Sequence, residues 1–477
     1  MIFNSIDFAI FFPLVFILYW GIFNKKKTLR NIFLIAVSYF FYGMWDWRFL
    51  SLIIMSSSTD FFIGKKIYTE TLNSKRKLWL IMSLIINLGF LGFFKYFHFF
   101  IDSFTSTFAL FGHNIEPHHI EIILPVGISF YTFQTLSYTI DIYNKKIAPT
   151  NKPFAFFAFV SFFPQLVAGP IERAKDLLPQ FESLSKIDYK QLKSGLLLMF
   201  YGFFKKIMIA DRLAIFVNNA YGDIENLDTI SACTAIVFFA FQLYLDFSAY
   251  SDIAIGSSRM LGFNLSLNFR RPYLANSFSD FWKRWHISLS SWFKDYLYIP
   301  LGGNKVIRTR RITNILIVFM VSGLWHGPSW NFVIWGFING LFILVFDSLL
   351  FQKNSTAAKR VFNSLFVSVS WALSLVFFRA ETLQDAFHLF SSVFTLDTKS
   401  LYDFGLNEIE FKFTIKLLLA FIVYEIILEN FADLYERFSN FHFIFRWAFF
   451  ISVLVFIVFY GSYGVGLNDN NFIYFQF

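Results

Sequence analysis

The stretch FAIFFPLVFILYW, residues 8–20, carries no charge and sets the pattern for the whole chain. Apolar segments of about 20 residues recur along most of the sequence, and a helix needs about that length to cross a hydrocarbon core about 30 Å thick. Phe, Trp and Tyr make up 22% of the residues, whereas the four charged residue types make up only 15%, against about 25% in soluble domains. A soluble globule of this composition could not cover itself with polar surface. We therefore expect an all-α polytopic integral membrane protein with about ten to twelve transmembrane helices.

The first apolar run has no basic residue before it, and Lys25, Lys26, Lys27 and Arg30 follow it. This order is typical of a first span and not of a cleavable signal peptide. Clusters of Lys and Arg at 25–30, 65–77 and 145–152 fall in every second loop, which places the N-terminus and the loop 95–121 outside by the positive-inside rule. The runs expected to span lie near 8–23, 31–45, 49–64, 78–94, 122–143, 313–325, 330–351, 361–378, 411–428 and 445–466.

The distribution of charge and the few possible metal-binding side chains argue against nucleic-acid binding and against a metal site. The net charge of +9 comes from short basic clusters between apolar runs, so we expect positive-inside loops and no nucleic-acid partner. The single cysteine, Cys233, excludes an intramolecular disulfide and any cysteine-based metal cluster. No carboxylate or cysteine at ligand spacing accompanies the histidines of the outer loop, so we expect solvated side chains and no metal site at His98, His113, His118 and His119.

The chain reads as one membrane domain over residues 1–477, with N-terminal helices in 1–150, a catalytic core in 151–350 and C-terminal helices in 351–477. The segment FFPQLVAGPIERAKDLLPQF, residues 162–181, interrupts this pattern with three prolines and several charges. Irregular backbone is tolerated at membrane depth only when protein or a cavity surrounds it, so this segment is either a surface loop or a re-entrant turn. A long helix is expected over 190–218 and another apolar run over 230–247, and no clean span is expected from 248 to 311.

The first candidate site is Trp325-His326, in SGLWHGPSWNFVIWGFING at 322–340. An ionisable residue inside an apolar stretch is a functional candidate, and a low dielectric keeps its imidazole neutral and basic. Gly323, Gly327 and Pro328 indicate a broken helix or a close backbone approach that opens His326 to a cavity. The alternative is a buried histidine that hydrogen-bonds a carbonyl of a neighbouring helix.

The second candidate is Trp285-His286, in a basic and aromatic region that also holds Lys283 and Arg284. A cytoplasmic basic loop explains these charges. The sharper hypothesis is a pocket for a phosphate-bearing acyl donor, because Arg and Lys bind phosphates and aromatic rings stack on a base. Ser279, followed by Asp280, is expected to cap a helix.

Common catalytic motifs are missing elsewhere. The sequence has no GxxxxGK[ST] and no GxGxxG, which disfavours an energy-driven pump, and it has no GxSxG nucleophile elbow. Histidine-based chemistry remains: a neutral imidazole takes the proton of a hydroxyl as that hydroxyl attacks a thioester or ester carbonyl.

At these residues the chain resembles the membrane-bound O-acyltransferase (MBOAT) family, and within it the membrane subunit of alginate O-acetylation, with the teichoic-acid D-alanylation membrane protein as a relative. The resemblance covers nearly the full length. It is carried, in order, by the motifs at 125–143, 162–181, 241–263, 285–304, 322–336 and 472–477.

The resemblance implies the MBOAT fold, in which spans and re-entrant or short helices surround a central funnel. The family's hallmark catalytic histidine matches His326, and its second polar active-site residue matches His286. His326 would then act as general base or proton shuttle, with His286 orienting the donor carbonyl. Trp285 and Trp325 would line the tunnel. Asp246 and Asp252, which flank Ser248 in YLDFSAYSD, would keep the site polar or pair with arginines, and Asp246 and Ser248 are candidate donor-binding residues.

The implied reaction moves an acyl group, most simply acetyl, from a cytoplasmic donor to an extracytoplasmic acceptor. The donor would be acetyl-CoA or an acyl-carrier thioester, with no bound cofactor. The resemblance further implies a bacterial inner membrane, contact with membrane lipid, a polysaccharide acceptor and a separate extracytoplasmic acetyltransferase of SGNH type. Three alternatives stay open: D-alanyl or peptidoglycan acyl transfer, a non-enzymatic polysaccharide flippase or exporter, and a scaffold for an envelope complex.

Overall fold

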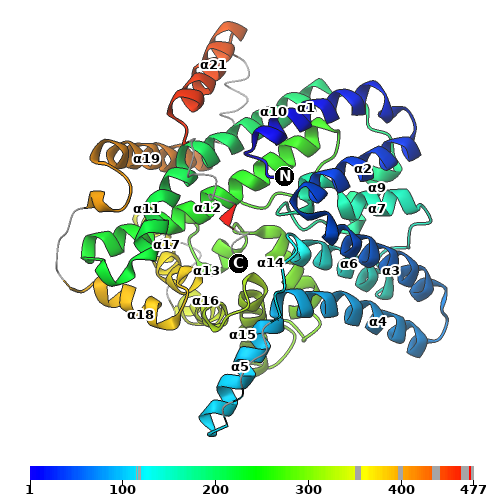
Figure 1. The fold of residues 1–477 in the computed structure, drawn as a ribbon, viewed down its shortest axis with the longest axis horizontal. Helices are drawn as coiled ribbons and strands as arrows, with labels where there is room; N and C mark the ends of the chain where they lie inside the picture. The colour runs from blue at the N-terminus through cyan, green and yellow to red at the C-terminus, as the bar shows by residue number, and fades with distance from the viewer. Residues whose placement is uncertain are drawn as a thin grey trace.

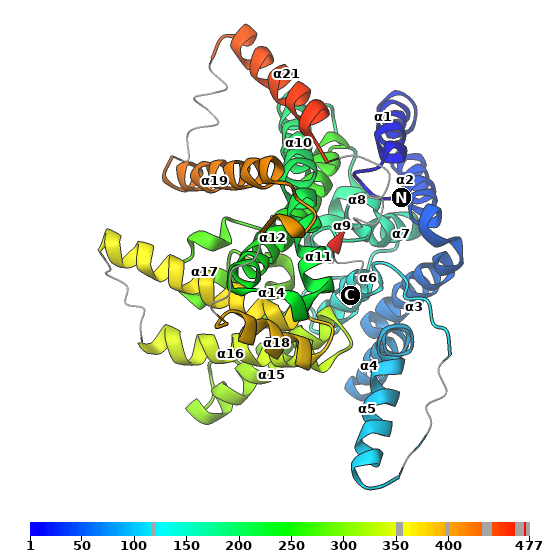
Figure 2. The same cartoon turned by 60° about the vertical axis from the view of Figure 1, so that its left-hand side comes forward.

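The computed structural model describes residues 1–113, 115, 120–349, 356–395, 401–431, 441–462 and 472–473. Within these ranges the chain is helical and contains no β-strand, which confirms the all-α fold class. Two helices extend away from the body at opposite ends, α5 (Phe97–Leu110) and α21 (Phe443–Tyr460) (Figures 1 and 2). Of the four outer-loop histidines, His118 and His119 lie outside the described residues.

The N-terminal part follows the expected apolar runs closely. Its helices are α1 (Ile6–Gly21), α2 (Lys27–Asp46), α3 (Leu50–Thr69), α4 (Asn73–Leu91) and α6 (Ile128–Tyr143). Helices α3 and α4 pack against each other and against α6. A π-helical turn, Gly92–Tyr96, joins α4 to α5.

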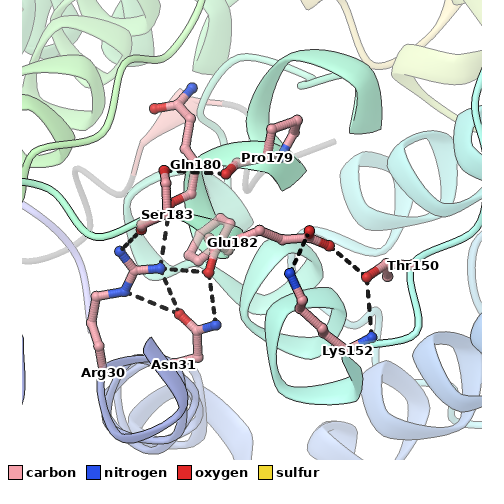
Figure 3. Close-up of polar contacts among 9 residues, drawn as sticks. Arg30, Asn31, Thr150, Lys152, Pro179, Gln180, Glu182 and Ser183 are labelled. Carbon is pink, nitrogen blue, oxygen red and sulfur yellow. Dashed lines mark hydrogen bonds and ion pairs between the residues drawn. The ribbon is translucent and has the colours of Figure 1, made fainter. Parts of the chain in front are cut away.

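The proline-rich segment follows α7 (Pro153–Ser161) and forms two short helices inside the protein, α8 (Phe163–Leu166) and α9 (Ala174–Glu182). Most of its residues are buried, which favours the re-entrant alternative over the surface loop. Side chains on two sides hold the C-terminus of α9 (Figure 3). Arg30 donates to the carbonyl oxygens of Gln180, Phe181 and Ser183, while Glu182 accepts from the side chains of Thr150 and Lys152.

The expected long helix over 190–218 is present as α10 (Tyr189–Phe203), a π-helical segment (Phe204–Ala210) and α11 (Asp211–Gly222). Helix α12 (Thr229–Met260) crosses the middle of the molecule (Figure 1). The apolar run expected over 230–247 lies in this helix, which continues beyond it through polar residues to Met260. Two of its polar side chains share one buried lysine: Lys205 lies 2.7 Å from Asp252 and from the Ser248 hydroxyl.

The C-terminal half contains α13 (Phe278–Trp282), α14 (Ile287–Phe293), α15 (Arg308–His326), α16 (Trp330–Leu349), α17 (Ala357–Arg379), α18 (Leu383–Ser392) and α19 (Glu408–Asn430). The N-cap of α13 is Ser277 and not Ser279. The Ser277 hydroxyl accepts from the Asp280 N–H at 3.0 Å, whereas the Ser279 N–H donates to Asp347 of α16. Helix α13 thus begins earlier than expected, and the carboxylate of Asp347 from α16 provides a second cap.

Among the described residues, six helices are long and apolar enough to cross a membrane: Ile6–Lys25, Asn73–Leu110, Thr229–Met260, Trp330–Asp347, Ala357–Arg379 and Phe443–Tyr460. The protein is therefore a multi-pass membrane protein. The count of ten to twelve spans stays a prediction.

Candidate active site

His326 is the last residue of α15, and glycines determine how the chain leaves it. A Cβ at Gly323 would collide with the carbonyl oxygen of Phe332, and one at Gly327 would collide with the Phe332 ring. The broken helix and close backbone approach expected from the sequence are therefore both present. The imidazole is 4% exposed, and its ring centroid lies 5.0–5.3 Å from those of Trp325, Trp335 and Phe378.

His286 precedes α14 and adopts the left-handed conformation, with φ 41° and ψ 55°. Few non-glycine residues adopt this region, and residues held in such conformations cluster at functional sites. The side chain is fully buried, and its Nδ1 lies 3.1 Å from Asn268 Oδ1. The backbone at His286 is therefore strained, and this conformation sets the direction of the imidazole.

The contact with Asn268 determines the tautomer of His286. Asn268 Oδ1 also accepts from the backbone N–H and the hydroxyl of Ser288, at 3.3 and 2.9 Å. A backbone N–H can only donate, so the atom facing His286 is the amide oxygen, and Nδ1 must carry the proton. The Nε2 atom then holds the lone pair that a base needs.

Electrostatics keep His286 neutral. It lies in the loop between α13 and α14, outside the six candidate spans, and burial lowers its pKa to about 3 because the charged form loses its hydration. A neutral imidazole can accept a proton or a hydrogen bond at ordinary pH.

The fold brings the two histidines together from different segments. Their ring centroids lie 6.4 Å apart, with the planes at 63°. The Trp325 ring contacts both of them, at 5.9 Å from His286 and 5.0 Å from His326. Phe130 of α6 lies against the same group, 5.4 Å from Trp325 and 6.4 Å from His286. The four rings form one buried cluster.

A cavity of about 80 Å³ opens beside this cluster. It is much smaller than the ~300–1,000 Å³ of drug-sized ligand sites, so it suits a small acyl group better than a fatty chain. His326 reaches it and His286 lies behind Phe130 and Trp325. Its lining residues are Trp45, Lys95, Leu124, Pro125, Val126, Gly127, Ile128, Ser129, Phe130, Val167, Trp325 and His326.

The basic residues near His286 lie apart from this cavity. Arg284 forms ion pairs with Asp280 at 3.1 Å and Glu429 at 2.9 Å, and Lys283 is exposed. Trp285 is 1% exposed and packs on Phe281 and Trp371. The charge of Arg284 is thus compensated within the protein.

Asp246 and Ser248 belong to a buried polar cluster on α12. Asp246 lies 2.7 Å from Lys206 and accepts the Ile473 backbone N–H at 2.8 Å, and Ser248 accepts from Lys205. The sequence predicts either a polar site or arginine partners for these residues, and the partners are lysines of the π-helical segment. Asp246 thereby ties the C-terminal motif to the helix that also carries Phe247, which lies 4.7 Å from His286.

Three residues that shape the site were missed. Asn268 sets the His286 tautomer, Gly127 forms the cavity wall, and Lys95 donates to the carbonyl oxygens of Trp325 and His326. For Lys95 the signal was a charge within an apolar run, which the sequence analysis assigned to the outer loop. Asn268 and Gly127 carried no local signal. In the described part of the chain, no group of three or more His, Cys, Asp and Glu side chains could hold a metal ion.

A buried carboxyl joins the segment after α8 to the loop that follows α12. Glu172 accepts from the backbone N–H and the hydroxyl of Ser266, at 2.6 and 2.8 Å. It lies between α8 and α9, outside the six candidate spans, and burial raises its pKa to about 7. The neighbouring Ile171 N–H donates to the Ser288 hydroxyl, so this segment also supports the loop that presents His286.

The sequence is similar to those of several bacterial enzymes. The protein named "Probable alginate O-acetylase" from Azotobacter vinelandii is 36% identical over 429 residues, which cover 89% of this chain and 84% of the relative. The peptidoglycan O-acetyltransferase of Helicobacter pylori is 34% identical over 447 residues, covering 86% and 83%. A teichoic acid D-alanyltransferase from Streptococcus thermophilus is 28% identical over 279 residues, covering 54% and 66%.

A family model also matches residues 148–380, a range that contains both histidines, and its description is the membrane-bound O-acyltransferase family. Together with two relatives that are more than 30% identical over most of both chains, this match confirms the resemblance found in the motifs. The chain belongs to the membrane-bound O-acyltransferase family and is an O-acyltransferase.

Proposed function

We propose that this enzyme moves an acetyl group from a cytoplasmic thioester across the membrane, for O-acetylation of a cell-envelope polysaccharide. The observation that carries the proposal is the cavity of about 80 Å³ with His326 in its wall. Its volume supports a small acyl group, and two relatives are named as O-acetylating enzymes. The chain works as one membrane unit, with residues 151–350 as its catalytic core.

In the proposed reaction, His326 is the catalytic base. A hydroxyl oxygen attacks the acyl carbon, the imidazole of His326 takes the hydroxyl proton, and the carbon–sulfur bond of the thioester breaks. The thiolate that leaves then receives the proton. His286, neutral and with its lone pair on Nε2, orients the donor or assists this transfer. A base of this kind contributes about 10²–10⁴-fold, and positioning in a dry site adds more.

The aromatic cluster around the histidines excludes water from the acyl group. Trp325 lines the cavity, while Trp285 stabilises the packing behind His286. The proposal keeps four further residues on the side of the acyl donor: Asp246, Ser248, Lys283 and Arg284. Lys283, which is exposed, is the one among them placed to meet the phosphates of a carrier.

Acetyl-CoA and an acyl-carrier protein both present phosphate, so both fit as donors. The final acceptor is reached through a separate extracytoplasmic acetyltransferase of SGNH type, and the enzyme resides in the bacterial inner membrane, in contact with lipid. Peptidoglycan is a second acceptor that the 34% identical relative favours. D-alanyl transfer has the weaker support of a 28% identical relative.

The test is the O-acetyl content of isolated envelope polysaccharide in deletion cells that express the wild-type chain or His326→Ala at matched membrane levels. His98→Ala is the control, because this half-buried histidine lies on α5 and is not among the residues that line the cavity. Loss of acetyl ester with unchanged polymer export supports acyl transfer. Unchanged acetylation with reduced polymer yield would instead favour a flippase or exporter, and no change in either would favour a scaffold.

A further inference from the structure

Lys95 reaches the end of the helix that carries His326. It lies in the π-helical turn between α4 and α5, and its Nζ donates to the carbonyl oxygens of Trp325 and His326, at 2.9 Å each. The neighbouring Tyr96 hydroxyl donates to the Leu324 carbonyl at 2.9 Å. The last carbonyls of a helix have no partner within the helix, so these two side chains supply what α15 lacks.

A helix cap explains only part of the position of Lys95. An ammonium has three N–H donors, and two of them satisfy the two carbonyls. Lys95 also lines the cavity, whereas Tyr96 does not. Among the described lining residues, Lys95 carries the one Lys, Arg, Asp or Glu side chain, and His326 carries the one imidazole. An ammonium group and a base therefore line the same small cavity.

Acyl transfer needs such a charge. When a hydroxyl adds to the acyl carbon, the carbonyl electron pair moves onto the oxygen and leaves an oxyanion, and fixed donors in a water-poor site stabilise it. The carbonyl oxygens of α15 hold the ammonium in place before the reaction, so it need not reorganise when the charge develops.

Resting on the function proposed above, we propose that Lys95 is the oxyanion-binding residue of this enzyme. Its third N–H binds the carbonyl oxygen of the acyl group in the cavity while His326 takes the hydroxyl proton. The tetrahedral adduct then collapses, the thiolate leaves with the proton from the imidazole, and Lys95 keeps its charge throughout.

The test uses inside-out membrane vesicles supplied with radiolabelled acetyl-CoA, in which label enters alkali-labile ester on endogenous envelope polymer. The variants are Lys95→Gln, Lys95→Arg, Tyr96→Phe and His326→Gln. Gln still donates to the α15 carbonyls but carries no charge, and Arg keeps the charge. Tyr96→Phe removes a cap of the same helix end without touching the cavity.

We expect Lys95→Gln to lower kcat about 10²–10³-fold, as the loss of an oxyanion donor does. The KM for acetyl-CoA and the melting temperature of the purified protein should change little. Arg should restore part of the rate, and Tyr96→Phe should stay within threefold of the wild type. If Lys95→Gln also stays within threefold while His326→Gln is inactive, the role of Lys95 is refuted and the proposed function survives. An equal loss in Lys95→Gln and Tyr96→Phe would make Lys95 a helix cap only. A wild type that transfers label neither from acetyl-CoA nor from an acetylated acyl-carrier protein would refute the proposed function itself.

Discussion

The side chain of His286 lies 6.4 Å from that of His326, ring centroid to ring centroid, with the Trp325 ring in contact with both. His326 lines the cavity directly, whereas His286 is separated from it by the Phe130 and Trp325 rings. The two imidazoles therefore have unequal positions. His326 is placed to meet the acceptor, and His286 is placed to act through orientation or relay.

Asn268→Leu tests the tautomer of His286. The substitution removes the oxygen that accepts from Nδ1–H, so the ring is free to carry its proton on Nε2, which then cannot act as an acceptor. We expect the rate of acetyl transfer by membrane vesicles to fall about tenfold or more, since one lost buried hydrogen bond costs about 1–3 kcal/mol. Asn430→Leu, on the exposed surface of α19, is the control. A wild-type rate in Asn268→Leu would contradict the tautomer assignment.

Gly127→Ala tests the wall of the cavity. Gly127 adopts φ +76°, and a Cβ there would lie 2.8 Å from the Leu166 carbonyl oxygen. Left-handed backbone costs a residue with a Cβ about 1–2 kcal/mol, and the contact adds to this. We expect a melting temperature lower by several degrees and reduced acetyl transfer. Gly89→Ala, near the C-terminal end of α4 with no atom within 4 Å of the added Cβ, should leave both unchanged or raise the stability slightly.

Arg30→Ala tests the hold on the buried α7 to α9 segment (Figure 3). The guanidinium is fully buried and donates to three carbonyls at the end of α9. Its removal takes a donor from each of them, although Asn31 still donates to the Phe181 carbonyl and the Ser183 hydroxyl to the Gln180 carbonyl. Because an unsatisfied buried acceptor costs about 1–3 kcal/mol, we expect a strong drop in membrane level and melting temperature. Lys27→Ala, exposed on the same helix, should match the wild type. An equally stable Arg30→Ala would show that the segment holds its place without this clamp.

Glu172→Gln tests the pH dependence of stability. Burial, and secondarily the nearby Asp176, raise the pKa of Glu172 to about 7, although Ser266 and Arg173 act in the opposite direction. A carboxyl whose pKa is higher in the folded state stabilises the fold below its unfolded value, about 4.3, and loses this contribution as pH rises through about 7. The melting temperature of the wild type should thus fall between pH 5 and pH 8 by more than that of Glu172→Gln.

The control for this measurement is Glu182→Gln. Burial acts on Glu182 to raise its pKa, but hydrogen bonds from Thr150 and Lys152 outweigh it and hold the pKa below its usual range. A carboxyl of this kind loses its contribution only as pH falls, so Glu182→Gln should keep the wild-type slope between pH 5 and pH 8. Equal slopes in the wild type and Glu172→Gln would contradict the assignment of Glu172.

The helices could be predicted from local sequence, because the thickness of the bilayer requires apolar runs of a definite length and such runs are visible in the sequence. It also found His326, since a histidine between glycines in an uncharged stretch is unusual. The end of α12 was mispredicted because polar residues count against a span, whereas here Asp252 and Ser248 are paired with Lys205 inside the protein. A hydropathy profile describes the composition of a segment but does not show which distant side chains pair with its polar residues.

The roles of other residues could not be predicted because they depend on contacts between distant parts of the chain. Lys95 lies far from His326 in the sequence, and only the packing of the π-helical turn against α15 brings it to the cavity. Asn268 likewise gains its role from the left-handed conformation of His286, which no composition indicates. Arg284 looked like a phosphate ligand by residue type, and the fold gives it Asp280 and Glu429 as partners.

The most direct measurement of the central claim is acetyl transfer by inside-out vesicles that contain either the wild-type chain or His326→Gln at equal protein level. Gln fills similar space and keeps hydrogen-bonding groups but cannot take a proton. We predict that label from acetyl-CoA enters alkali-labile ester in the wild type and falls by about 10²–10⁴-fold in His326→Gln. A His326→Gln variant that transfers acetyl at the wild-type rate would contradict the account.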